Sequence, residues 1–244
     1  MSLRRIDDKI RKDKILAIVI DQYIKTVTPV SSGLIAQSHP LDLSSATIRN
    51  VLAELEEEGY LTHPHTSAGR IPTEKGYRYY VDNLMLEIQL LEEEKNQIKE
   101  EYRKEALQLE NLLEKTSELI SETTHYTGIV SLDGARNKVF YRGTNLVVNY
   151  PDYQDIKKVG NILQALEEKE RILRIINQDI TSKIRIFIGH ELALSNIESC
   201  SLVVSRYQLR NGPSGRIAVL GPTRMNYKHV VSALEYLSRL IEKI

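Results

Sequence analysis

Residues 44–59 read SSATIRNVLAELEEEG, and this stretch decides the fold of the first part of the chain. Ser44 is a favoured helix N-cap, and Gly59 is a favoured residue just past a helix end. The apolar residues between them recur at helical spacing and predict one buried face: Ile48, Val51, Leu52 and Leu55. The stretch therefore predicts an amphipathic helix with a second face open to solvent.

The solvent face of this helix carries side chains that are suited to reading DNA. At 100° per residue, Ala46, Asn50 and Ala53 lie opposite the buried face, with Arg49 beside them. Asn can bond adenine and Arg can bond guanine through paired hydrogen bonds, and small residues let a helix approach a groove floor. A solvated Arg and Asn on an ordinary helix is the alternative interpretation, and the helix alone leaves both open.

The two ends of the helix differ in charge and in hydrogen-bonding groups. Hydroxyl groups that suit phosphate gather at its N-terminus: Ser44, Ser45 and Thr47. Residues 54–58 are mostly acidic, and DNA repels acidic side chains. Only the N-terminal half of the helix is therefore expected to enter a groove.

The neighbouring segments complete the layout of a small domain. The spacing of apolar residues and the capping residues predict a helix over 9–27, a helix over 31–38 and the helix after Ser44. A short strand at 60–62, a loop with strand flanks over 63–72 and a further helix after Thr73 are predicted to follow. Three helices followed by a strand, a loop and a helix are typical of a winged helix-turn-helix. Residues 1–80 are therefore predicted to form a DNA-binding domain of this type.

The loop HPHTSAGR at 63–70 is the predicted wing. It offers a guanidinium, an imidazole and hydroxyl groups that suit phosphate or minor-groove contact: His65, Thr66, Ser67 and Arg70. A metal site at His63 and His65 is the rival interpretation. Without a nearby cysteine or carboxylate in the sequence, that site is disfavoured.

The middle of the chain predicts a long connecting helix over 81–125. Residues 81–122 contain no proline or glycine, are rich in good helix formers, and hold 5 basic against 12 acidic residues. A heptad frame places mostly apolar residues along one stripe of this helix. The stripe fits either the seam of a coiled-coil dimer or a face that packs on its own protein, and both remain open.

Residues 126–244 predict a second domain that mixes strands with helices. Strands are expected near 128–132, 138–142, 145–150, 183–189, 200–209 and 217–220, with helices within 152–177 and over 227–244. This pattern indicates an α+β chain whose second domain is of the α/β type. Cys200 is expected to be a buried thiol, and Arg224 either binds an anion or pairs with a carboxylate.

Composition bounds the class of protein. The single cysteine excludes an internal disulfide, and the longest aliphatic run, Ile15–Ile20, is too short to cross a bilayer. No apolar leader follows the N-terminus, so a cytoplasmic protein without membrane contact is expected. The sequence shows no catalytic, metal or cofactor motif, so an enzyme ranks behind two other hypotheses, a DNA-binding regulator and an RNA-binding winged-helix module.

Five stretches resemble the HrcA family of heat-inducible transcription repressors. They are SSATIRN at 44–50, LEEEGYL at 55–61, PHTSAGRIPT at 64–73, KGYRYYVD at 75–82 and GRIAVLGPTRMNY at 215–227. The first is shared by other winged-helix repressors, but the third is specific. Two separate motif regions in the right order make a chance resemblance improbable.

The resemblance implies a GAF-like C-terminal domain and a homodimer that binds an inverted-repeat operator in double-stranded DNA. It further implies repression of chaperone operons until heat or unfolded protein intervenes, with the chaperonin as a partner that supports the active form. Family members usually carry an inserted dimerisation domain, most of which this chain lacks between Leu119 and Lys138. The connecting helix and the GAF-like domain are therefore left to form the dimer. A regulator of other genes, with a ligand-sensing GAF-like domain, is the alternative.

Overall fold

The computed structural model of the chain describes residues 3–38, 43–64, 69–85, 90, 92–105, 109–133, 138–150, 156–177, 183–193, 197–210 and 212–243. The chain divides into two compact units, Met1–Leu86 and Glu87–Ile244. Both combine helices with an antiparallel sheet, which gives the chain an α+β fold. Among the described helices, none is both long enough and apolar enough to cross a membrane.

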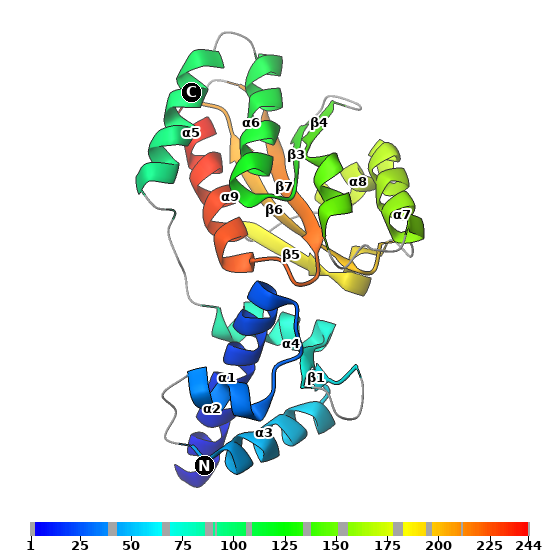
Figure 1. Ribbon diagram of the computed structural model, residues 1–244. Coiled ribbons are helices and arrows are strands. Elements are labelled where there is room, and N and C mark those ends of the chain that lie inside the picture. Colours follow the sequence, from blue (N-terminus) through cyan, green and yellow to red (C-terminus); the bar gives the residue numbers. More distant parts are fainter. Residues whose placement is uncertain are drawn as a thin grey trace. The chain divides into compact units, whose positions relative to one another are not determined.

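The N-terminal unit contains helices, a two-stranded sheet and a closing helical turn (Figure 1). In order these are α1 (Leu3–Thr26), α2 (Ser32–Ser38), α3 (Ser45–Glu57), β1 (Leu61–Thr62), β2 (Ile71–Pro72), α4 (Glu74–Tyr79) and the π-helical turn η1 (Tyr80–Leu84). β1 and β2 pair antiparallel, with Leu61 opposite Pro72. The order of elements is the one that the sequence predicts for this segment.

Local sequence explains where α3 begins and ends. The Ser44 side chain accepts a hydrogen bond from the Thr47 N–H at 3.1 Å, which satisfies one free donor of the first turn. The helix buries the four predicted residues, Ile48, Val51, Leu52 and Leu55. Gly59, with φ of 77°, turns the chain into β1. The buried face packs on apolar residues of α1 and α2, which include Ile15, Val19 and Ile35.

The C-terminal unit is built on a five-stranded antiparallel sheet of order β4-β3-β7-β6-β5. The strands are β3 (Thr127–Leu132), β4 (Val139–Arg142), β5 (Ile184–Ile188), β6 (Cys200–Gln208) and β7 (Ser214–Pro222). Its helices are α5 (Glu92–Glu105), α6 (Leu109–Thr124), α7 (Ile156–Glu167), α8 (Lys169–Ile176) and α9 (Tyr227–Ile241), with 3₁₀ turns η2 (Thr144–Asn149) and η4 (Gly189–Leu192).

Helices cover both faces of this sheet (Figure 1). α6 and α9 pack on one face, against β3, β6 and β7. α7 and α8 cover the other face through apolar residues that share a core with the strands: Ile162, Leu166, Ile172 and Ile176 with Ile129, Leu202, Val204 and Ala218. Cys200 belongs to the same core and is 1% exposed, which confirms the predicted buried thiol.

The predicted long connecting helix over 81–125 is wrong as a single element. The chain forms η1, α5 and α6 in its place, and α5 and α6 lie in the same compact unit as the sheet. Leu112, Leu119 and Ile120 of α6 are buried, and α6 packs against β3, β4 and α9 of its own chain. An amphipathic pattern shows that one face is covered but not what covers it, and for α6 the cover is the sheet.

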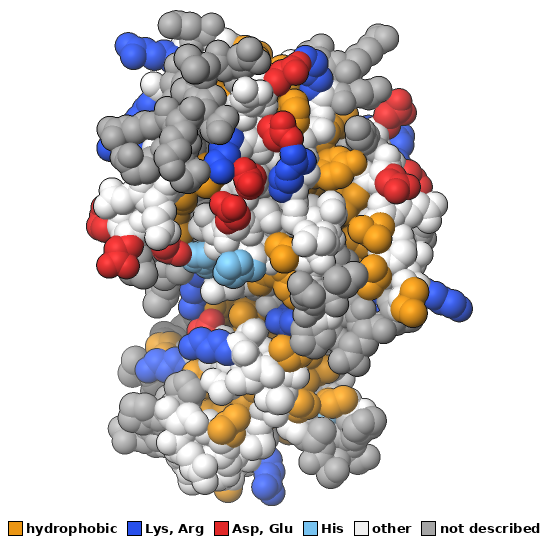
Figure 2. All heavy atoms as spheres, turned by 45° about the horizontal axis from the view of Figure 1, so that its top comes forward, with side chains coloured by type: hydrophobic (Ala, Val, Ile, Leu, Met, Phe, Trp, Pro, Cys, Tyr) orange, Lys and Arg blue, Asp and Glu red, His pale blue; other side chains and the backbone are white. Residues whose placement is uncertain are grey.

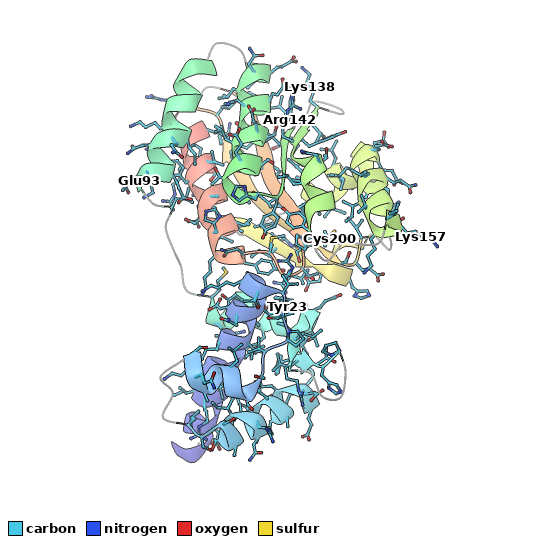
Figure 3. The ribbon with its side chains drawn as sticks, in the orientation of Figure 1. Tyr23, Glu93, Lys138, Arg142, Lys157 and Cys200 are labelled. Atoms are coloured by element: carbon cyan, nitrogen blue, oxygen red, sulfur yellow. The ribbon has the colours of Figure 1, made fainter. Side chains whose placement is uncertain are left out.

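Polar contacts fasten α5 and α6 within the unit. His229 Nε2 of α9 lies 3.2 Å from Glu94 Oε1, and the Tyr236 hydroxyl donates to the Lys95 carbonyl at 2.9 Å. Two ion pairs join α6 to the β4 segment, Lys138 with Glu110 and Arg142 with Glu114. Acidic and basic side chains accordingly lie side by side on the face of the molecule in Figure 2, and Figure 3 labels both basic partners.

The strand predicted at 145–150 is also wrong, because residues 144–149 form the 3₁₀ turn η2. The run contains β-branched residues, which favour strands. Gly143, with φ of 79°, turns the chain at the end of β4, and the Leu146 N–H then donates to the Gly143 carbonyl at 3.0 Å. A turn geometry set by one glycine therefore overrides the local strand preference.

Candidate nucleic-acid interface

The exposed face of α3 is the centre of the candidate interface. Ala46, Arg49 and Asn50 are exposed, as the helical spacing predicts, whereas Ala53 is half-buried. Within the described part of the chain, the Arg49 and Asn50 side chains make no hydrogen bond or ion pair. Both side chains are therefore available to a groove that meets this face of the helix.

The hydroxyl groups at the start of α3 already have partners within the unit. The Ser44 and Thr47 hydroxyls lie 2.9 Å apart, and Ser44 also caps the helix. The Ser45 hydroxyl donates to the Ser32 hydroxyl of α2 at 3.3 Å, which links the two helices. Ser44 and Ser45 remain exposed, so each oxygen can also meet a phosphate placed at the helix start.

Two carboxylates at the acidic end of α3 pair with a basic side chain of α1. Lys12 Nζ lies 2.8 Å from Glu54 Oε2 and 2.6 Å from Glu58 Oε1. Hydrogen bonds to Glu54 and Glu58 raise the pKa of Lys12 well above its ordinary value, so the ammonium group stays charged. The sequence interpretation treated these carboxylates as repelling charges, whereas the structure shows that two of them serve to hold α3 on α1.

The loop between β1 and β2, which the sequence predicts as a wing, is described only at its base. His65, Thr66 and Ser67, which the sequence predicts as contacts, lie outside the described residues. The guanidinium of Arg70 lies 2.7 Å from Glu56 Oε2, and His63 Nδ1 contacts the other oxygen of the same carboxylate. Of the four wing residues predicted to touch DNA, Arg70 is thus the one with an intramolecular partner in view. Sequence reasoning missed Glu56, because an acidic run does not reveal which of its members faces a wing.

Two tyrosines, at the end of α4 and the start of η1, donate hydrogen bonds to aspartates of α1. Burial and a hydrogen bond to Asp13 Oδ1 at 2.9 Å raise the pKa of Tyr79 to about 12. Burial and a hydrogen bond to Asp21 likewise raise the pKa of Tyr80 far above its ordinary value. Both phenols therefore remain neutral in the folded unit at a pH where they ionise in the unfolded chain.

These pKa shifts predict how the stability of the N-terminal unit depends on pH. The folded pKa is raised, so the stabilisation is fully present below the unfolded pKa of about 10 and is lost as pH rises towards 12. Denaturant titrations between pH 9 and pH 12 measure this loss. The Tyr79→Phe variant, which has no phenol to ionise there, is expected to lose less stability over the same range. An equal loss in both proteins would contradict the assignment to Tyr79.

The described part of the C-terminal unit contains a groove of mixed polarity. The groove, of about 820 Å³, lies between α5 and α6 and is lined by residues of mixed polarity that include Glu94, Lys115 and His125. Arg224 is 9% exposed at the start of α9, close enough to Tyr150 for its charge to offset part of the burial that raises the pKa of that phenol. Among the described residues, no three potential metal ligands gather in one place.

Comparison with known proteins agrees with this architecture. The family model "HrcA protein C terminal domain" matches residues 91–231. A crystal structure of a hypothetical protein shares the fold, with a TM-score of 0.74 and 18% identity over 96% of this chain and 97% of that one. The heat-inducible transcription repressor HrcA of Carboxydothermus hydrogenoformans is 30% identical over 332 residues, 96% of this chain and 97% of the relative. That of Moorella thermoacetica is 30% identical over 98% of this chain and 99% of the relative.

The lengths of these alignments show that this chain lacks residues that its relatives have inside the aligned stretch. Because 96% of 244 residues is about 234, the 332 aligned positions include about 98 at which this chain has no residue. The same alignment spans 97% of the relative, so these positions lie within the aligned stretch. The chain therefore belongs to the HrcA family of heat-inducible transcription repressors, as a short form.

Proposed function

We propose that the chain is a cytoplasmic transcription repressor that binds duplex DNA through its N-terminal unit, in the manner of a winged helix-turn-helix. In this proposal α3 enters the major groove, and the loop between β1 and β2 is the wing. The protein acts as a homodimer on an inverted-repeat operator and represses chaperone operons. The C-terminal unit is a GAF-like domain that contributes to the dimer.

The observation that carries the proposal is the division of charge along α3. Arg49 and Asn50 are exposed in the N-terminal half without partners among the described residues, while Glu54 and Glu58 pair with Lys12. The half of the helix proposed to meet DNA thus keeps the Arg49 and Asn50 side chains free, and two carboxylates in the half that DNA would repel pair with a lysine. Membership of a family whose relatives are named heat-inducible transcription repressors supports the same function.

Selection of bound sequences from random duplex DNA tests the proposal. A two-fold dimer is expected to enrich two half-sites in inverted orientation, spaced by about one helical turn or a multiple of it. Affinity for the selected site is expected to fall as salt rises, because phosphate contacts release counterions. Preference for structured RNA over every duplex would refute the proposal, and enrichment of a single half-site would refute the dimer.

Arg49→Ala is expected to weaken binding to the selected site by about 1–3 kcal/mol and to relax the preference at one base position. The reason is loss of a paired hydrogen bond to a base edge. Competition assays against sites mutated one base at a time measure both effects. Arg11→Ala is the matched control, because it also removes one exposed guanidinium, but from α1, where Arg11 pairs with Asp8. An equal loss of affinity on all sequences would assign Arg49 to a phosphate instead.

A further inference from the structure

Glu56 joins the two arms of the β1–β2 hairpin to the end of α3. One carboxylate oxygen contacts His63 Nδ1, just after β1, and the other lies 2.7 Å from Arg70 Nη2, just before β2. The Glu56 and Arg70 side chains are both 23% exposed, so solvent weakens their attraction less than it would on the open surface. A single helical carboxylate thus touches both sides of the wing base.

The backbone of Arg70 is fixed at a second point. The Arg70 N–H donates to the Val30 carbonyl at 2.8 Å, and the Val30 N–H donates to the Arg70 carbonyl at 2.9 Å. Gly69 lies so close to this pair that an added Cβ would stand 2.5 Å from the Val30 carbonyl carbon. Val30 lies in the segment that connects α1 to α2, so the returning arm of the wing is held against the proposed helix-turn-helix itself.

The hairpin needs such support because its ladder is very short. β1 and β2 contain two residues each, and an isolated two-stranded hairpin is marginally stable at best. Its direction relative to α3 is therefore set by contacts outside the ladder. Among the described residues, the Glu56 carboxylate is the side chain of α3 that meets both arms of the hairpin.

We infer that Glu56 is a positioning residue for DNA binding: through Arg70 and His63 it holds the wing at a fixed angle to α3. Arg70 then acts within the same clamp and not as a phosphate contact. The inference rests on the proposed DNA-binding function and deepens it. It assigns a favourable role to a negative charge that lies on the helix proposed to enter the groove.

Neighbouring carboxylates give a matched test. Glu56→Ala and Glu57→Ala each remove one negative charge from adjacent positions of α3, where alanine is a good helix former. Glu57 is exposed and makes no hydrogen bond or ion pair with the described residues, so its loss is expected to leave affinity for duplex DNA unchanged or slightly raised. Glu56→Ala is expected to lower the affinity about tenfold, the effect of losing a charge-assisted hydrogen-bonded pair.

A double-mutant cycle separates positioning from direct contact. If Arg70 acts only through Glu56, the double variant Glu56→Ala/Arg70→Ala is expected to bind about as weakly as Glu56→Ala. Arg70→Ala is expected to bind no more weakly than either, because it keeps the contact of Glu56 with His63. The salt dependence of binding is then expected to be the same in all three variants. If Arg70 touches a phosphate, Arg70→Ala reduces the salt slope by about one, and Glu56→Ala binds as well as Glu57→Ala. That result would overturn the inference.

Amide exchange provides a readout that does not depend on DNA. Amide exchange at Val30 and Arg70 is expected to quicken in Glu56→Ala while exchange at Val51, in the buried face of α3, stays unchanged. Weaker binding by Glu56→Ala without quicker exchange at Val30 and Arg70 would contradict a role in positioning. If the wild type and Glu57→Ala themselves fail to prefer any duplex, the proposed function is refuted. If both bind their site normally and Glu56→Ala binds it with the same affinity, only the inference about Glu56 is refuted.

Discussion

Replacement of Gly215 by alanine is expected to destabilise the C-terminal unit by about 3 kcal/mol or more. A Cβ at this position would stand 2.1 Å from the Ser131 carbonyl oxygen and 2.3 Å from the Tyr207 hydroxyl. A shift of either atom would break hydrogen bonds, because Ser131 belongs to the β3 ladder and the buried Tyr207 hydroxyl donates to that same carbonyl at 3.0 Å. β7 has hydrogen-bonded neighbours on both sides, so the strain reaches both ladders.

Denaturant unfolding followed by a probe of the C-terminal unit, such as amide exchange of β6, measures this loss. Gly160→Ala is the matched control within the same unit. Nothing lies within 4 Å of a Cβ added to Gly160, which is exposed in α7. Alanine there is expected to stabilise the unit by about 0.5–1 kcal/mol, because glycine is a poor helix former. A Gly215→Ala protein as stable as the Gly160→Ala protein would contradict the packing described around β7.

Ile48→Ala is expected to destabilise the N-terminal unit by about 2–5 kcal/mol and to abolish most DNA binding at moderate temperature. Ile48 is fully buried and lies in the face of α3 that packs on α1 and α2. Its loss leaves a cavity where α3 is held in place. The exposed residues that follow it, Arg49 and Asn50, then lose the support that orients them.

Asn50→Ala provides the contrast on the same helix. Asn50 is exposed, so its replacement is expected to change the free energy of unfolding by about 0.5 kcal/mol or less while still weakening specific binding. Chemical unfolding and duplex titration of both variants at equal protein concentration give the comparison. A stable Ile48→Ala protein that binds its site normally would show that the buried face of α3 does not set the geometry of the exposed one.

Local signals predicted α3 well because everything that defines it lies within sixteen residues. The cap at Ser44, the buried set from Ile48 to Leu55 and the turn at Gly59 all appear in the structure as the sequence indicates. The same holds for the start of α4, where the Thr73 hydroxyl accepts a hydrogen bond from the Gly76 N–H at 3.1 Å. Side-chain hydroxyls before a helix and glycines after it act on backbone groups a few residues away.

Features that depend on distant partners could not be predicted in the same way. The apolar stripe of α6 fits a dimer seam and a sheet equally well, and only the folded chain shows β3 beneath it. Glu56 belongs to a run of three glutamates that look alike in sequence, although only the first of them meets His63 and Arg70. The identity of a carboxylate's partner depends on where loops return, which periodicity does not encode.

The order of the strands has a consequence for synthesis of the chain. The N-terminal unit spans Met1–Leu86, so it has all its residues once Leu86 has left the ribosome. The sheet is different, because β7 is the last strand in the sequence and the middle one in space. Its pairing with β3 places Leu220 opposite Thr127, far apart in the sequence. Until β7 emerges, the β3–β4 pair and the β5–β6 pair cannot join into one sheet, and the edges of β3 and β6 that β7 will occupy stay unpaired. During translation, the proposed DNA-reading unit is therefore complete well before the unit attached to it, and the nascent chain is most exposed to aggregation in that interval.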